Sequence, residues 1–334
     1  SVDQAGNTAT SDPFTIEIDA TAPVITLNGS AAISVELGGV YTELGATADT
    51  GETVVIDNSA VNTSLIGLYE VTYNATDSFG NVANEVIREV TVVDTVIPEI
   101  NPIGTADLSW GAVLNISESQ SNGTVSITTT GVDDGQVLTV VLNTITYTNT
   151  VTNNSTVVTI TAAGLGALVD GETYTLTADV SDASGNAAAT VTSSQFSVDF
   201  STPTINAIGT ADLSWGAVLN STESQNNGTV SVTTTGVEDG QVVTITLNSQ
   251  TYTNTITNNS TVVPITAAGL GGLTDGQTYT LTADVSDVAG NAAATVTSSQ
   301  FSVDTTLPEL VSVTLSVNSS NGSSLMRPRV QNGT

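Results

Sequence analysis

Residues 173–186 read TYTLTADVSDASGN, and residues 278–291 read TYTLTADVSDVAGN. In the first of these stretches, the apolar Leu176 and Val180 fall on one face of an extended chain and the hydroxyl-bearing Thr177 falls on the other. An alternation with period two is typical of a β-strand with one buried face. The Asp-x-x-Gly-Asn that follows it predicts a tight turn, because Asp bonds to nearby backbone and Gly accepts a positive φ.

This stretch belongs to a longer repeat. Residues 95–199 and 200–304 align over their full length without an insertion or a deletion. In the first copy, alternating Val-, Ile- and Thr-rich runs predict strands over 124–130, 136–143, 144–151, 155–162, 173–181 and 188–198. About seven strands in about 100 residues is the size of an immunoglobulin-like sandwich. The sequence therefore predicts an all-β protein of tandem immunoglobulin-like β-sandwiches, arranged end to end as a rod.

A recurring boundary pattern separates all the units: each unit ends in a strand and an aspartate, and a short linker with a proline follows. Residues 22–94 form a shorter and different unit, which we expect to be an Ig-like or PKD-like β-sandwich. Residues 1–21 match the end of each later unit, so we interpret them as the C-terminal strand of a preceding, truncated module. Residues 305–334 resemble the start of a further truncated module. Linkers of four or five residues ending in proline predict stiff joints.

Charge and missing residue types exclude several classes of function. The 334 residues include 33 acidic and 3 basic side chains, for a formal net charge of −30, and contain no Cys and no His. The basic residues are Arg88, Arg327 and Arg329, so Lys is absent too. Nucleic acids and anionic membranes would repel this chain, and no apolar run approaches the ~18–20 residues of a membrane span. Because the Ser and Thr hydroxyls lack their usual activating bases, we expect a protein that is not an enzyme.

The repeated units resemble a known class of module. The segments that carry this resemblance are GVEDGQ from Gly236, residues 274–291 and Phe301–Asp304. They are similar to the bacterial Ig-like repeats of giant surface adhesins of the RTX or Bap type, and residues 22–94 are similar to the hyalin-repeat or PKD-like surface modules. The resemblance implies an extracellular, cell-surface location. Leu108–Gly111 departs from the pattern, so no function is transferred to that segment.

Acidic residues concentrate in the segments that we expect to form loops at one end of each sandwich. With 124–130 as strand B and 173–181 as strand F, the B–C and F–G loops lie at the end where the chain enters. Both loops should therefore face the preceding linker. The carboxylates expected at these junctions are Asp94, Asp133, Asp134, Asp179 and Asp182 at one, Asp199, Glu238, Asp239, Asp284 and Asp287 at the next, and Asp19, Asp49, Glu52 and Asp77 at the first.

So many carboxylates in one joint repel each other unless they are screened or bridged. Calcium takes six to eight oxygen ligands and accepts flexible carboxylates and carbonyls. We therefore predict a structural calcium ion at each junction, which the adhesin resemblance also implies. The alternative is that Asp-Gly and Asp-x-x-Gly-Asn are turn formers, with the Asp bonding to local N–H groups.

The composition and the repeats together favour a mechanical function. We expect a stalk or extender of a large extracellular bacterial adhesin, with each sandwich spanning roughly 35–45 Å from strands at ~3.3 Å per residue. Its partners would be neighbouring modules of the same chain. The alternative is a subunit of a filament, sheath or surface layer, in which identical chains join by β-strand addition. Binding of glycans or ice is a third possibility, although Trp110 and Trp215 are better interpreted as core residues than as a sugar platform.

Overall fold

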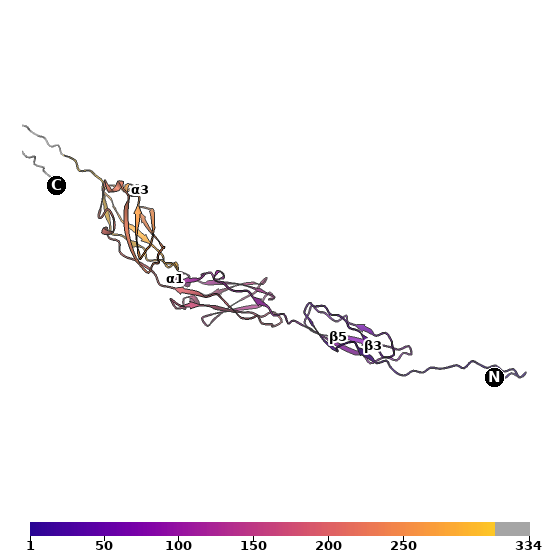
Figure 1. Ribbon diagram of the computed structural model, residues 1–334. Helices are drawn as coiled ribbons and strands as arrows, with labels where there is room; N and C mark the ends of the chain where they lie inside the picture. The colour runs from indigo at the N-terminus through magenta and orange to yellow at the C-terminus, as the bar shows by residue number, and fades with distance from the viewer. Residues whose placement is uncertain (311–334) are drawn as a thin grey trace, which may run out of the picture. The chain divides into compact units, whose positions relative to one another are not determined.

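The computed structural model describes residues 1–310, which fall into two compact units: Ser1–Asp199, and a second unit that begins at Phe200. In both units β-strands and a few helices of three to five residues make up the regular structure (Figure 1). The prediction of an all-β chain of immunoglobulin-like sandwiches is confirmed. The predicted start of a further module lies, from residue 311 onward, outside the described residues.

Residues 99–199 form a sandwich of a four-stranded and a three-stranded sheet, with a small third sheet beside them. The four-stranded sheet has the order β11 (Ile145–Thr150), β10 (Val137–Leu142), β14 (Leu176–Asp179) and β15 (Val191–Thr192). The three-stranded sheet has the order β12 (Ser155–Ile160), β9 (Gly123–Thr130) and β7 (Glu99–Ile100). The small sheet has the order β13 (Thr173–Tyr174), β16 (Phe196–Asp199) and β8 (Val113–Asn115), with β8 and β16 parallel.

Two of the predicted strands are broken, and both breaks have one cause. Residues 173–181 divide into β13 and β14, and residues 188–198 divide into β15 and β16, so that each chain segment passes from one sheet to another. At the crossing, Ser193 Oγ accepts a hydrogen bond from Leu176 N at 3.0 Å, and Ser193 N donates to Leu176 O at 2.9 Å. The prediction of two continuous strands was wrong because a buried serine replaces the ladder there, which an alternation pattern cannot reveal.

Tight hairpins set the register of the long strands. Asn143 and Thr144, between β10 and β11, have φ values of 46° and 67°. Asn153 and Asn154, between β11 and β12, have φ values of 50° and 55°. Two consecutive residues with positive φ define the type I′ turn, whose twist matches that of the strands that it joins. Asn tolerates this conformation well, whereas the β-branched Thr144 does not.

The core follows the period-two pattern of the sequence. Leu138, Val140 and Leu142 of β10 have at most 1% of their surface exposed. Trp110 is 5% exposed and packs edge-on against Phe196, with 5.4 Å between ring centroids. Trp215 is 4% exposed and packs in the same way against Phe301. Both tryptophans are therefore core residues, as the sequence indicated.

The helical segments are short. Each α-helix begins at a residue whose side chain caps it, and the three are α1 (Ile116–Ser119), α2 (Ala162–Leu165) and α3 (Ala267–Gly271). The 3₁₀ segments are η1 (Thr105–Asp107), η2 (Thr210–Asp212) and η3 (Glu223–Gln225). Thr161 caps α2 by accepting a hydrogen bond from Gly164 N at 3.2 Å. This agrees with the absence of a sustained helical period in the sequence.

The second unit repeats this arrangement with its own core, which extends from Ile205 to Val303. Its sheets have the orders β21-β20-β24-β25, β17-β19-β22 and β18-β26-β23, and β18 runs parallel to β26. The strands are β17 (Thr204–Ile205), β18 (Val218–Asn220), β19 (Gly228–Thr235), β20 (Val242–Leu247), β21 (Gln250–Thr255), β22 (Ser260–Ile265), β23 (Thr278–Tyr279), β24 (Leu281–Asp284), β25 (Val296–Thr297) and β26 (Phe301–Asp304).

Residues 25–93 fold around a smaller core that includes Val71, Tyr73 and Val90. A four-stranded sheet has the order β2 (Ala32–Glu36), β6 (Val86–Val93), β5 (Gly67–Asn74) and β4 (Val55–Asp57), and β1 (Ile25–Leu27) pairs with β3 (Ala46–Ala48). Strands β2 and β6 are parallel. Residues 9–24 contain no strand, and the side chains of Phe14, Ile16 and Ile18 are 88%, 68% and 87% exposed.

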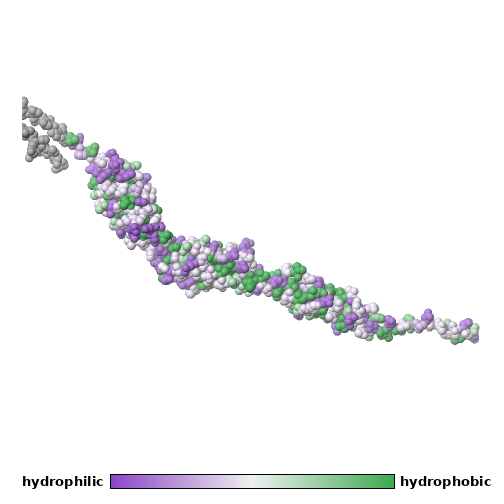
Figure 2. All heavy atoms as spheres, in the orientation of Figure 1, coloured by the Kyte–Doolittle hydropathy of each residue, from purple (hydrophilic) through white to green (hydrophobic). Residues whose placement is uncertain are grey.

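Hydrophilic, neutral and apolar residues are interspersed on the face seen in Figure 2. The neutral shade is expected from the many Ser, Thr and Gly residues, because their hydropathy lies near the middle of the scale. Over residues 1–310, no helix has the length and the apolar character that crossing a membrane requires.

Candidate functional site

The Asp-x-x-Gly-Asn turn is a closed hydrogen-bonded loop. In residues 182–186, Asn186 N donates to Asp182 Oδ1 at 2.8 Å, and Asn186 Nδ2 donates to Asp182 Oδ2 at 2.9 Å. Gly185, with a φ of 92°, allows the chain to fold back. Burial acts to raise the pKa of Asp182, but the bonds from Asn186 outweigh it, so this pKa lies below its ordinary value. Asp77 and Asp287 make the same two bonds with Asn81 and Asn291.

The loop 182–186 also holds the linker that precedes its sandwich. Asn186 Nδ2 donates to the backbone oxygen of Asp94 at 3.1 Å, and Ser184 Oγ donates to Asp94 Oδ2 at 2.7 Å. The next linker residue, Thr95, is held by the preceding sandwich: its N and Oγ1 donate to the two carboxylate oxygens of Glu36 at 2.7 and 2.8 Å. Adjacent residues of one linker therefore contact two different sandwiches.

The B–C loop approaches the F–G loop as the topology predicts. Asp133 Oδ2 accepts a hydrogen bond from Ala183 N at 2.9 Å. In the second unit Glu238 Oε2 accepts from Val288 N at 2.9 Å, so the longer side chain reaches the equivalent atom. Asp94 and Asp133 thus bind neighbouring residues of a single loop.

Other residues of the predicted carboxylate groups point elsewhere. Asp134 Oδ1 accepts from Asn153 N, and Asp239 Oδ1 accepts from Asn258 N, both at 2.7 Å, in the hairpin loops. Asp179 and Asp284 accept hydrogen bonds from the hydroxyls of Thr190 and Thr295. The side chains of these four residues serve turns and strand ends. The backbone of Asp199, the last residue of β16, pairs with Asn115.

The carboxylates expected at the first junction are also separately engaged. Asp49 Oδ1 accepts from Val24 N at 2.8 Å. Asp19 Oδ1 accepts from Thr21 N at 2.9 Å, and the backbone oxygen of Asp19 accepts from Asn81 Nδ2 at 3.2 Å. Glu52 bonds to the hydroxyl of Thr50. The Asn81–Asp19 contact repeats the contact between Asn186 and Asp94.

These contacts test whether the residues fit a calcium ion. Carboxylate and carbonyl oxygens are the right donors, but calcium needs six to eight of them. Within residues 1–310, no group of three or more acidic, His or Cys side chains is close enough to hold a metal ion. At the linker, Asp94 and Asp133 reach one loop, while both oxygens of Asp182 accept bonds from Asn186. As placed, the residues do not form a calcium site, and the predicted site remains a prediction.

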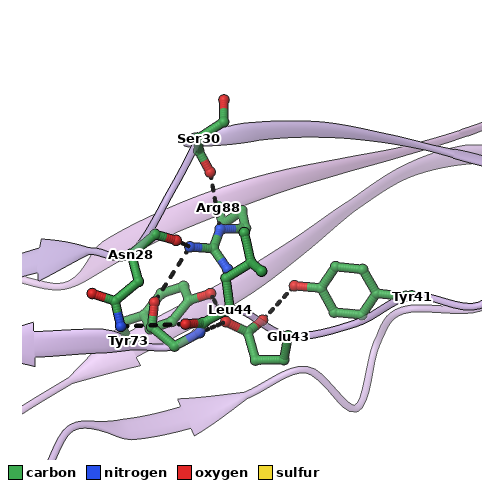
Figure 3. A network of polar contacts seen from close by, with 8 residues as sticks. Asn28, Ser30, Tyr41, Glu43, Leu44, Tyr73 and Arg88 are labelled. Atoms are coloured by element: carbon green, nitrogen blue, oxygen red, sulfur yellow. Dashed lines mark hydrogen bonds and ion pairs between the residues drawn. The ribbon is translucent and has the colours of Figure 1, made fainter.

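A second polar cluster lies in the core of residues 25–93. The Arg88 side chain is fully buried, and its Nη1 lies 2.7 Å from Glu43 Oε1 (Figure 3). Arg88 Nε donates to Ser30 O at 3.1 Å, and Nη2 donates to Asn28 O at 2.6 Å. The guanidinium also lies 5.3 Å from the ring centre of Tyr73, within cation–π range. Every side of this buried charge therefore has a partner.

Glu43 receives the other half of this network. The hydroxyls of Tyr41 and Tyr73 both donate to its carboxylate, and Gly45 N donates to Oε1 at 2.7 Å. Burial acts to raise the pKa of Glu43, but these donors outweigh it and hold the pKa below its ordinary value. Burial, followed by the bond to Glu43, raises the pKa of Tyr73. The network ties the loop around residue 43 to β5 and β6.

Sequence reasoning missed several residues that hold the linkers. Glu36, Ser184 and Asn81 were not selected, and neither was Asp275, which accepts hydrogen bonds from Thr305 N at 2.6 Å and from Thr306 Oγ1 at 2.9 Å. The recurring Asn at the end of each Asp-x-x-Gly-Asn motif was a usable signal. Glu36 gave no signal, because 59 residues separate it from Thr95.

Comparison with known proteins gives one family match and a set of similar solved structures. Residues 25–92 match a family model described as a bacterial surface protein, Ig-like domain. A solved bacterial immunoglobulin-like domain from the M. primoryensis ice-binding adhesin is 33% identical, covering 31% of this chain and 96% of its own, with a TM-score of 0.23. A Ca²⁺-stabilized adhesin that helps an Antarctic bacterium reach out and bind ice is 25% identical, covering 87% of this chain and 75% of its own, with a TM-score of 0.40.

A structure from a 1.5-MDa bacterial ice-binding adhesin is 22% identical, covering 85% of this chain and 98% of its own, with a TM-score of 0.40. None of the curated protein sequences compared with the chain matches it. The family match defines the class of the first complete sandwich: residues 25–92 belong to the Ig-like domains of bacterial surface proteins.

Proposed function

We propose that this chain is a non-catalytic extender segment of a large extracellular bacterial adhesin. The observation that carries the proposal is the linker Asp94–Thr95, whose two residues are bound by different sandwiches. A spacer needs modules that are individually stable and joints that transmit position from one module to the next. The sequence identity to a domain of an adhesin supports the same role.

The residue inventory fits a structural role. Without Cys, His or Lys, the sequence offers none of the usual pairs of nucleophile and base. In residues 1–310 the polar clusters with the most contacts are engaged in holding loops, linkers and strands. An extracellular location and the neighbouring modules as partners are part of this proposal. Calcium at the linkers stays a prediction, which the next experiment tests.

Small-angle X-ray scattering of the whole chain tests the extender role. For two to three sandwiches in line we expect a maximum dimension on the order of 100–130 Å, from strands at ~3.3 Å per residue. The measurement should be made with millimolar calcium and again with excess chelator. A collapsed particle in both solutions would contradict the extender role. Extension only with calcium would assign the stiffness to the ion.

A filament subunit is the second candidate, and one observation favours it. Phe14, Ile16 and Ile18 alternate along a segment without strand structure, and each is at least 68% exposed. An exposed alternating segment can add to the free edge of a sheet in another chain. Light scattering over a hundredfold concentration range would reveal growth of assemblies. The triple variant Phe14→Ser, Ile16→Ser, Ile18→Ser should abolish that growth if strand addition causes it, and a concentration-independent monomer would exclude this candidate.

A further inference from the structure

We propose that Asp94 and Thr95 form a hydrogen-bonded clasp that fixes the joint between the sandwich ending at Val93 and the sandwich beginning at Glu99 without a metal ion. In this proposal Asn186 is the positioning residue. The proposal rests on the proposed extender function, since it states how one joint of the extender is held. It also departs from the calcium prediction, because the atoms expected to bind an ion bind the linker and its loops instead.

The first half of the clasp is formed by Glu36, at the end of β2. Its Oε1 accepts from Thr95 N at 2.7 Å and its Oε2 accepts from Thr95 Oγ1 at 2.8 Å. Bonds to an ionised carboxylate are shorter and stronger than neutral ones. The strand beside it is held as well, because Leu37 N donates to Val93 O at 2.7 Å. Two donors of one linker residue therefore bind both oxygens of one side chain.

The second half is formed by the loop 182–186. Ser184 Oγ donates to Asp94 Oδ2 at 2.7 Å, and Asn186 Nδ2 donates to Asp94 O at 3.1 Å. Asn186 Nδ2 is not free to turn away, because the same nitrogen also donates to Asp182 Oδ2 at 2.9 Å. The amide nitrogen thus donates one hydrogen to Asp182 within the loop and the other to Asp94 of the linker. These two bonds give the Asn at the end of the motif a role that needs no metal ion.

Both halves recur elsewhere in the chain. Asn81 Nδ2 donates to Asp19 O at 3.2 Å and to Asp77 Oδ2 at 2.7 Å, so the Asn half is repeated at an earlier linker. Asp275 accepts from Thr305 N at 2.6 Å and from Thr305 Oγ1 at 3.0 Å, so the carboxylate half is repeated after β26. Each half of the clasp therefore occurs at more than one linker. In one half a carboxylate binds a threonine, and in the other an asparagine binds an aspartate carbonyl.

Distance measurement between spin labels tests the clasp directly. The chain contains no Cys, so Ser64→Cys and Ser126→Cys place single labels at exposed positions on the two sides of the joint. In excess chelator we expect one narrow distance peak for the labelled whole chain. Adding Glu36→Ala and Ser184→Ala should remove the narrow peak, and Asn186→Ala alone should weaken it. Glu70→Ala is the matched control, since it removes an exposed carboxylate from β5, away from the linker, and should leave the peak unchanged.

The outcomes separate the clasp from its alternatives. An unchanged peak after Glu36→Ala and Ser184→Ala would overturn the proposal, and so would a broad distribution that narrows only when calcium is added. Circular dichroism of each variant should show intact sandwiches, so that loss of the peak reports the joint. If scattering contradicts the extender role while the narrow peak persists in chelator, the extender function fails and the clasp stands.

Discussion

The hydroxyl of Tyr147 lies directly over Gly164, so that a Cβ atom on this glycine would be 1.8 Å from the tyrosine oxygen. Gly164 is in α2 and Tyr147 is in β11, so this contact packs the helix against the sandwich. In the second unit, Tyr252 and Gly269 repeat the 1.8 Å approach. The glycine is therefore required for space and not for a positive φ.

Gly164→Ala should destabilise its sandwich by about 1–3 kcal/mol, the usual cost of overpacking a core. Tryptophan fluorescence during urea unfolding reports this sandwich and the one in the second unit, since Trp110 and Trp215 are the tryptophans of the chain. Adding Tyr147→Phe should restore most of the loss, because it removes the atom in conflict. The buried hydroxyl of Tyr147 has no hydrogen-bond partner among residues 1–310, so little is lost with it. Gly104→Ala, with 3.6 Å to its nearest neighbour, is the control. Equal losses at both glycines would contradict this account.

Arg88→Met should destabilise residues 25–93 by about 3–5 kcal/mol, because it leaves the Glu43 carboxylate without its buried partner. This sandwich contains Tyr41, Tyr69 and Tyr73 and no Trp, so near-ultraviolet circular dichroism of tyrosine can be compared with tryptophan fluorescence. The unfolding midpoint of the tyrosine-reported transition of this sandwich should fall, and the midpoints of the other transitions should not change. Combining Arg88→Met with Glu43→Leu should recover part of the loss. A shift of the tryptophan transition would contradict the assignment.

The stability of the same sandwich should fall in acid. The pKa of Glu43 in the folded chain is held below its ordinary value of 4.5, so its contribution is present above that value and is lost as the pH falls through the lower, folded pKa. Urea midpoints of the tyrosine signal between pH 6 and pH 2 should decline mainly below about pH 4.5. Glu43→Gln should be less stable at neutral pH and should have a flatter profile. Parallel profiles for the two proteins would refute the link to Glu43.

Thr144→Gly should stabilise the β10–β11 hairpin by about 0.5–1 kcal/mol, because a β-branched residue with a φ of 67° is strained and Gly is not. Thr146→Gly, two residues further along β11, is the matched control and should be destabilising, since Gly weakens an extended strand. Urea unfolding followed by tryptophan fluorescence compares the two. Stabilisation by both glycines, or by neither, would argue against strain at Thr144.

If the linkers bind calcium, the carboxylates that reach the F–G loop should matter and the others should not. Isothermal titration calorimetry of the chelated chain should then show weaker binding after Asp133→Asn and Glu238→Gln, which preserve size while removing charge. Asp179→Asn and Asp284→Asn should have no effect, because these side chains bond to Thr190 and Thr295. Two outcomes would rule calcium out at the linkers. Either the parent chain gives no heat of binding, or it gives a heat that none of the variants alters.

The sequence pattern predicted the long strands well because their burial repeats every second residue. The expected strand 124–130 differs from β9 by one residue, and 155–162 begins with β12 at Ser155. The known order of strands in an Ig-like sandwich also placed the B–C and F–G loops together, and Asp133 does reach Ala183. Patterns of this kind need only the local alternation and a general topology.

The direction of each carboxylate could not be predicted in that way. Asp133 and Asp134 are neighbours, yet one binds Ala183 and the other binds Asn153, because successive residues of a loop point to different sides. Arg88 and Glu43 are 45 residues apart, and Glu36 and Thr95 are 59 apart. These pairs depend on tertiary packing, for which the spacing in a single sequence carries no signal.

Strands β8 and β16, paired in parallel, have a consequence for a chain under tension. A pull at the two ends of the sandwich draws β8 and β16 in opposite directions along their length, since β8 is drawn toward the N-terminus and β16 toward the C-terminus. The hydrogen bonds between them are then sheared together, whereas a hairpin pulled at its open end would lose them one by one. The pairs β2 with β6 and β18 with β26 have the same geometry. In each sandwich, a pull along the chain therefore loads the hydrogen bonds of its parallel strand pair at the same time.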